Sequence, residues 1–526
     1  MDVSWLKIMN RVSKKELNVF FYLVLLTIIF LFNWVNFRHS WYDASVGAIE
    51  ALMLREGREL YSGLVIQQPP FAFILTYLLG LPGDKFLSAA LYIQFGCYVI
   101  TPALLLYLSF IARLRMFSTL CLTGAALSLT GFPLWNIYHI TTYTTLAAAL
   151  LFIVCALAFI AENKKLNLNL PIIIATFLCA FTNQYYLPLC LPVAAVALSA
   201  KTDKTDKTEA RSGSIAGLIV LGVLSIFLIF FFWTNIPDAI DILVASSYAN
   251  ISKHASNPLQ SLIEPVISAG KMNFGEWIKQ GHFFALALWF NFFLFLDSLR
   301  SKVPSRLMQG TQAALLFSLL ILSRHYGFSR TITLCGPLFL FLFFLTAIEF
   351  EKTQKKSFQY SMNVICAFIL FSFSLKSIKT AMDTAYWVEV DFHRNEKVLM
   401  QKEYAKVFSD AAAVLNNHRS CMIVSAGIKY PSMYIIGRGN WIYYLVDAIP
   451  AWKYTILEDT LLQKKHFDEV LDKVRLIPSG KCIARFGFGN LNSNTETEFR
   501  ASLEKILESH FKLVDRAEGL KIYMRK

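Results

Sequence analysis

The stretch Trp41-Tyr42-Asp43-Ala44-Ser45-Val46 decides the fold, because it follows the first long apolar run of the chain, residues 18–37. That run is long enough to cross the hydrocarbon core of a bilayer, which needs about 20 apolar residues. It lacks the short apolar core and the small-residue cleavage site of a signal peptide, so we expect an uncleaved first transmembrane helix. Asp43 is then a lone carboxylate where that helix emerges into water.

The composition indicates a polytopic α-helical membrane protein. Of the 526 residues, 56% are hydrophobic and only 16% are charged, whereas a soluble protein has about 25% charged residues. The net charge of +14 does not indicate nucleic-acid binding, because the basic residues lie mostly in short loops between apolar runs. About eleven transmembrane helices are predicted, at 18–37, 86–111, 117–131, 143–161, 168–183, 186–200, 214–233, 281–299, 308–323, 331–349 and 358–375.

The distribution of Lys and Arg predicts the orientation. The loops on the side of the N-terminus contain eighteen of them, and the longer loops on the other side contain nine. The positive-inside rule therefore places the N-terminus in the cytoplasm, with a bacterial inner membrane as the default. An odd helix count then divides the chain into a transmembrane domain, 1–375, and a periplasmic domain, 376–526. The transmembrane domain has two long outer segments, a first loop (residues 38–85) and a loop at 234–280.

The tail is predicted to be an extracytoplasmic α/β domain. Helical character extends over 396–415, and strand-like runs lie at 421–425 and 482–486. The runs 511–515 and 520–524 predict a hairpin around Glu518-Gly519. Cys421 and Cys482 could pair in an oxidising compartment, or they could be two separate buried thiols, since pairing depends on geometry.

The candidate helices carry no charged residue in their middle. Ion-coupled transporters and proton pumps usually place ionisable groups at that depth. We therefore expect the chemistry at the outer surface of the membrane.

The first loop resembles that of the GT-C fold glycosyltransferases that use polyprenyl-phosphate sugars, in particular the protein mannosyltransferase-like group that includes the lipid A aminoarabinose transferase. The resemblance depends on Asp43, an amphipathic helix predicted over 44–57, Gly57-x-x-Leu60-Tyr61 and Gln68-Pro69-Pro70. The two prolines are expected to end one helix and turn the chain. The resemblance extends to Arg324-His325-Tyr326 followed by Cys335-Gly336-Pro337, which is similar to the family's basic-aromatic turn and Pro-bearing helix.

The resemblance implies an inverting transfer of a sugar from a polyprenyl-phosphate donor to an acceptor hydroxyl on the periplasmic face. Asp43 would be the catalytic base, and a single carboxylate suits one displacement with inversion. Arg324 and Arg330 flank one short turn and would bind the donor phosphate, with His325 and Tyr326 as further donors. Additional candidates are Lys271 and Arg58 for the phosphate, and Glu50, Gln68 and His139 for the acceptor.

Each of these residues has a structural alternative. Asp43 could serve only as the N-cap of the following helix. Arg324 and Arg330 could anchor the chain at the membrane interface, and Arg58 could extend toward lipid headgroups. Glu50 could be a solvated residue on a helix face.

The expected partners are the lipid-linked donor, a glycan, lipid or protein acceptor, and membrane lipids. No nucleic acid and no cofactor are expected; the sequence contains no metal-ligand cluster, and a divalent metal ion remains an alternative. Two other functions also remain open at this point. One is a flippase or transporter of lipid-linked glycans, and the other is a non-enzymatic envelope scaffold.

Overall fold

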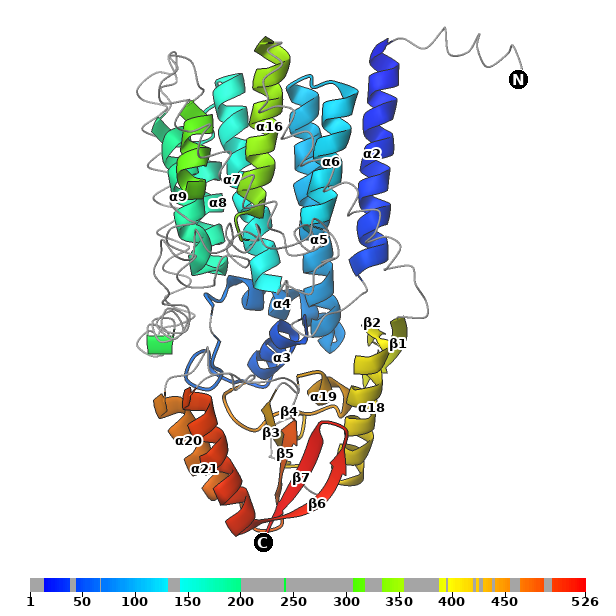
Figure 1. The fold of residues 1–526 in the computed structure, drawn as a ribbon, viewed down its shortest axis with the longest axis vertical. Coiled ribbons are helices and arrows are strands. Elements are labelled where there is room, and N and C mark those ends of the chain that lie inside the picture. Colours follow the sequence, from blue (N-terminus) through cyan, green and yellow to red (C-terminus); the bar gives the residue numbers. More distant parts are fainter. Residues whose placement is uncertain are drawn as a thin grey trace, which may run out of the picture.

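The protein has a helical bundle at one end and a mixed sheet with its own helices at the other (Figure 1). Helix α2 (Lys14–Phe37) begins at the end of the bundle that is far from the sheet. The computed structural model describes residues 14–37, 44–66, 68–130, 142–199, 241–242, 306–316, 334–353, 387–393, 396–419, 422–424, 429–437, 440–454, 464–486 and 494–526.

The bundle forms from continuous apolar runs, whose backbone groups a helix satisfies internally. Besides α2 it contains α5 (Phe86–Ile111), α6 (Met116–Thr130), α7 (Thr142–Lys164), α8 (Asn169–Thr182), α9 (Leu187–Ser199) and α16 (Gly336–Thr353). These helices coincide with predicted spans, and residues 306–316 are helical as well. The candidates 214–233, 281–299 and 358–375 lie outside the described residues, so the number eleven stays a prediction.

The surface of α2 is apolar and exposed. Phe20, Leu23 and Leu31 are each more than half exposed, and the helix stands at the edge of the bundle (Figure 1). A row of large exposed apolar side chains on one helix fits a lipid environment. Within the described ranges, Phe86–Ile111 and Tyr143–Lys164 are the two helices both long and apolar enough to cross a membrane.

The first loop lies between the bundle and the sheet (Figure 1). Its helix α3 (Ala44–Arg55) confirms the predicted helix, but α3 is not amphipathic, because every residue from Ser45 to Met53 is buried. The alternative of a solvated Glu50 is therefore wrong, since this residue is only 4% exposed.

The Pro-Pro step of the first loop has a different role from the expected one. Pro70 is the N-cap of helix α4 (Phe71–Gly80), so the step starts a helix instead of ending one. Proline suits the beginning of a helix because its missing N–H would have no partner there. A short 3-10 helix, η1 (Pro82–Asp84), then leads into α5.

The C-terminal domain is built on a five-stranded sheet with the strand order β4-β3-β5-β7-β6. β3 pairs in parallel with β4 and with β5, and the other pairs are antiparallel. The strands are β3 (Ser432–Gly437), β4 (Ile449–Pro450), β5 (Cys482–Phe486), β6 (Phe511–Ala517) and β7 (Leu520–Arg525). The helices are α18 (Lys402–Asn417), α19 (Asn440–Leu445), α20 (Lys464–Arg475) and α21 (Asn494–His510).

The predicted hairpin is confirmed as β6 and β7, with Gly519 at φ 73° in the turn, and the strand predicted at 482–486 is confirmed as β5. The helix predicted over 396–415 is wrong at its start, because Glu396–Gln401 is strand β2, which pairs with β1 (Trp387–Phe392). Of the strand predicted at 421–425, residues 422–424 are described, and Ile423 makes an isolated bridge to Ser432.

A single hydrophobic core joins the first loop to the C-terminal domain. Leu52 and Ile66 of the loop belong to the same cluster as Trp441, Trp452 and Ile522. A second cluster fills the bundle. The first loop therefore packs with the C-terminal domain, although most of the chain separates them in sequence.

Candidate functional site

The described part of the predicted site is the junction between the first loop and the C-terminal domain. It contains Glu50, Arg58 and Gln68. Helix α3 begins at Ala44, so Asp43 directly precedes it in the sequence. The other predicted residues lie outside the described residues, and their roles stay predictions: Asp43, His139, Lys271, Arg324, His325, Tyr326 and Arg330.

Tyr61 connects two of the predicted acceptor-binding residues. Its side chain is 2% exposed, and its hydroxyl donates a hydrogen bond to the backbone carbonyl of Gln68 at 3.1 Å. Burial raises the pKa of Tyr61, and the negative charge of Glu50 raises it further. Tyr61 is thus a protonated donor at neutral pH. Glu50, Tyr61 and Gln68 form a buried polar group inside the loop.

Arg58 contacts the C-terminal domain. Its guanidinium donates to the carbonyl of Pro450 at 3.4 Å. The backbone continues this contact, because the N–H of Val65 donates to the carbonyl of Lys453 at 2.8 Å. The first loop therefore extends the edge of the C-terminal domain beside β4. Binding of a donor phosphate by Arg58 stays a prediction.

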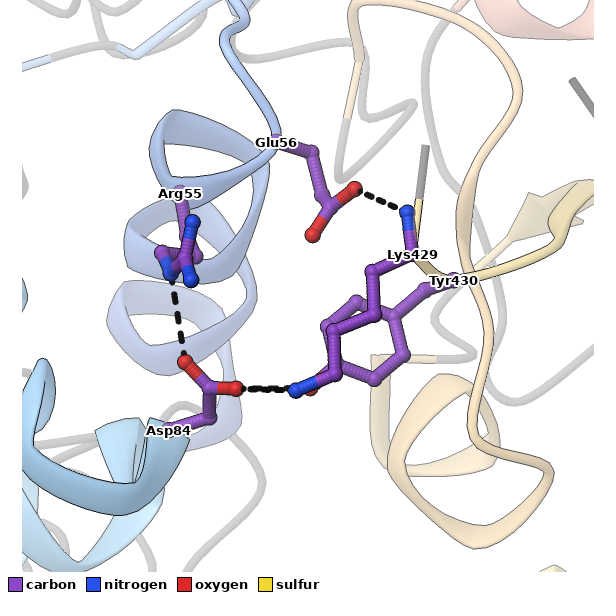
Figure 2. Close-up of polar contacts among 5 residues, drawn as sticks. All are labelled: Arg55, Glu56, Asp84, Lys429 and Tyr430. Carbon is purple, nitrogen blue, oxygen red and sulfur yellow. Dashed lines mark hydrogen bonds and ion pairs between the residues drawn. The ribbon is translucent and has the colours of Figure 1, made fainter. Parts of the chain in front are cut away.

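The strongest polar contact at the junction centres on Asp84, which the sequence analysis missed. One carboxylate oxygen accepts from Arg55 Nε at 3.3 Å. The other accepts from Lys429 Nζ at 2.5 Å and from the Tyr430 hydroxyl at 3.1 Å. Glu56 accepts from the backbone N–H of Lys429 at 2.8 Å. Figure 2 shows these five residues, which we name the Asp84 clamp.

The charges of Asp84 and Lys429 in the clamp stabilise each other. The hydrogen bond from Lys429 lowers the pKa of Asp84, and Tyr430 and the charge of Arg55 lower it further, against burial, which raises it. Conversely, the hydrogen bond to Asp84 raises the pKa of Lys429. Both directions favour the charged pair at neutral pH.

The clamp predicts a pH-dependent contribution to stability. The pKa of Asp84 is lowered in the folded state, so its contribution is fully present above the ordinary value of 3.8 and is lost as the pH falls through the lowered folded pKa. At pH 7, Asp84→Asn should destabilise the protein by about 1–3 kcal/mol. Thermal unfolding of both proteins from pH 7 to pH 3 should show the difference closing at the acid end. A difference that is independent of pH would contradict this.

A second contact ties the C-terminal domain to the bundle. Glu396 of β2 is 1% exposed, and its carboxylate accepts from the backbone N–H of Ser88 at 2.7 Å. Ser88 lies in the first turn of α5, where unsatisfied N–H groups and the helix dipole favour a negative charge. This hydrogen bond to the start of α5 explains why Glu396 can lie in a strand with its carboxylate buried.

The described residues do not contain a group of three or more His, Cys, Asp or Glu that could hold a metal ion. In the C-terminal domain, Cys482 is disulfide-bonded. Cys421, the partner considered from the sequence, lies outside the described residues.

The resemblance predicted from the sequence is confirmed at the level of the fold, because a solved structure shares the fold of this chain over nearly its whole length. A solved structure similar to this chain is ArnT from Cupriavidus metallidurans bound to undecaprenyl phosphate. The comparison has a TM-score of 0.53 and covers 97% of this chain and 98% of ArnT, at 10% sequence identity. No family model and no curated protein matches the sequence. At this identity the likeness concerns the fold alone.

Proposed function

We propose that the protein is an inverting glycosyltransferase that moves a sugar from a polyprenyl-phosphate donor to an acceptor hydroxyl. The observation that carries the proposal is the likeness over nearly the whole chain to a structure bound to undecaprenyl phosphate. The position of Asp43 directly before α3 supports it, because the sequence resemblance assigns the catalytic base to that residue.

In the proposed reaction, Asp43 removes the proton of the acceptor hydroxyl as its oxygen forms a bond to the anomeric carbon. The bond from that carbon to the donor phosphate breaks, and its electron pair stays on the phosphate oxygen. Arg324 and Arg330 stabilise the charge that develops there. His325 and Tyr326 are further donors in this proposal.

The remaining candidates are assigned by their place in the chain. Lys271 and Arg58 are proposed as additional phosphate ligands. The buried Glu50 and Gln68 are proposed to order the acceptor side, because the Tyr61 hydroxyl bonds to the Gln68 backbone and lies within the field of the Glu50 charge. His139 is proposed as an acceptor contact. No cofactor is proposed.

We propose a bacterial inner membrane location, with the transmembrane domain at 1–375 and a periplasmic domain at 376–526. The disulfide at Cys482 supports an oxidising compartment for the second domain. The shared core supports placing the first loop on that same side of the membrane, because it packs directly against the domain.

Donor binding tests the proposal directly. Removing two charged hydrogen-bond donors should weaken binding of undecaprenyl phosphate to Arg324→Met/Arg330→Met protein in nanodiscs by at least about 10–100-fold. The matched control is Arg115→Met, an exposed arginine directly before α6, which should bind like the wild type. Equal binding by both variants would remove the proposed phosphate site. Binding and translocation of the lipid without sugar transfer would favour a transporter instead.

A further inference from the structure

The Asp84 clamp lies at one end of a helix whose other end adjoins Asp43. Helix α3 has twelve residues, so it is about 18 Å long. Arg55, its last residue, bonds to Asp84, and Asp43 directly precedes its first residue. A movement of the clamped end along the helix axis would therefore be transmitted to the residue before Ala44.

The backbone at Asp84 is shaped for this contact. Gly83 and Asp84 both have positive φ angles, 78° and 56°. Residues other than glycine seldom adopt a positive φ, and among them Asp and Asn tolerate it best. The turn directs one carboxylate toward Arg55 of the first loop and toward Lys429 of the C-terminal domain at once (Figure 2). Asp84 itself is 8% exposed.

The close-packed core around α3 sets most of the position of the helix, because its buried side chains interdigitate with their neighbours. Burial holds α3 between the bundle and the C-terminal domain, but apolar attraction is non-directional. Hydrogen bonds and ion pairs depend on distance and angle. The three bonds to Asp84, together with the bond from Lys429 to Glu56, therefore add directional contacts that fix the last turn of α3 relative to the C-terminal domain.

We propose that Asp84 and Lys429 are positioning residues for the transfer reaction, which makes the C-terminal domain part of the catalytic apparatus. Resting on the proposed function, the inference is that these residues hold α3 so that Asp43 reaches the acceptor hydroxyl. They do not touch the substrates themselves. A displacement of a catalytic group by about 1 Å can cost about 100-fold in rate.

The test uses the full-length protein in nanodiscs and two variants that keep the local shape. Asp84→Asn removes the charge and keeps a residue that tolerates positive φ. Lys429→Met removes the ammonium and keeps the aliphatic stem. Both should lower kcat by about 10–100-fold with KM for the donor lipid within about 3-fold, because they move the base without altering donor contacts. Lys429→Arg should restore most of the kcat.

The matched control is Lys397→Met. Lys397 also pairs with carboxylates, Glu389 and Asp391, but on the exposed β1–β2 hairpin. The kcat of Lys397→Met should equal that of the wild type. An effect as large as that of Lys429→Met would overturn the positioning role, because the loss would then follow from removing any lysine ion pair.

Amide hydrogen exchange of residues 45–54 gives a readout that does not depend on activity. Exchange should become faster in Asp84→Asn and Lys429→Met, and it should be unchanged in Lys397→Met. Unchanged exchange in both clamp variants, or faster exchange with a normal kcat, would overturn the positioning role. A wild-type protein that transfers no sugar, but shows the exchange contrast, would overturn the proposed function and leave the clamp standing.

Discussion

Asp43→Asn is expected to lower the rate of sugar transfer by about 10²–10⁴-fold, the usual contribution of a general base. The amide has the size of the carboxylate but cannot take a proton from the acceptor hydroxyl. The substitution also separates the two roles predicted for Asp43, because Asn and Asp are equally good N-caps. A purely capping role therefore predicts normal activity, and a catalytic role predicts the loss.

The measurement is single-turnover transfer from a lipid-phosphate sugar, with the amount of folded protein checked by size exclusion and thermal unfolding. Glu59→Gln is the matched control, since Glu59 is an exposed acid of the same loop whose carboxylate accepts a hydrogen bond from the neighbouring Ser62 hydroxyl. It should transfer at the wild-type rate. Wild-type activity in Asp43→Asn would refute the assignment of the base.

Trp441→Ala is expected to have the largest effect on stability, about 3–5 kcal/mol, the usual cost of removing a large buried aromatic side chain. Trp441 is 1% exposed and belongs to the core shared by the first loop and the C-terminal domain. Its ring lies 5.2 Å from that of Phe392, centroid to centroid. The cavity would open in α19, which packs against α3, so the loop should loosen together with the domain.

Thermal unfolding in nanodiscs measures the loss, and amide exchange of α3 tests whether the loop loosens with the domain. Leu476→Ala is the control, because Leu476 is 79% exposed in the same domain and surface substitutions usually change stability by less than about 0.5 kcal/mol. If Trp441→Ala unfolds the domain but leaves amide exchange in α3 unchanged, the stability of the first loop does not depend on the C-terminal domain.

Local patterns were enough to predict the elements formed by one continuous run. The apolar run 86–111 was predicted with both ends of α5 correct. The β6–β7 hairpin was predicted from two short alternating runs around Gly519, whose positive φ a glycine accommodates easily. In each case the sequence signal and the structure depend on neighbours a few residues apart.

The errors have a common cause, which is contact between distant parts of the chain. Val398 and Met400 alternate as a strand should, and the buried Glu396 accepts from Ser88 of the distant helix α5, a contact that no local pattern shows. Glu50 was predicted to be either functional or solvated, and it is buried in α3, which packs against α4, α5 and α19. For Asp84, the Pro82-Gly83 pair signals a turn, but the turn gives no sign of Lys429.

The shared core has a consequence for biosynthesis. Leu52 and Ile522 belong to the same core, but Ile522 is synthesised long after Leu52 because most of the described chain separates them. During that time the apolar side chains of the loop lack part of the core that covers them in the folded protein. We therefore expect nascent chains to need a chaperone on the side of the membrane proposed for the loop, and chains truncated before β7 to have an unprotected loop. The folded junction would then form only after strand β7, which contains Ile522, has been made.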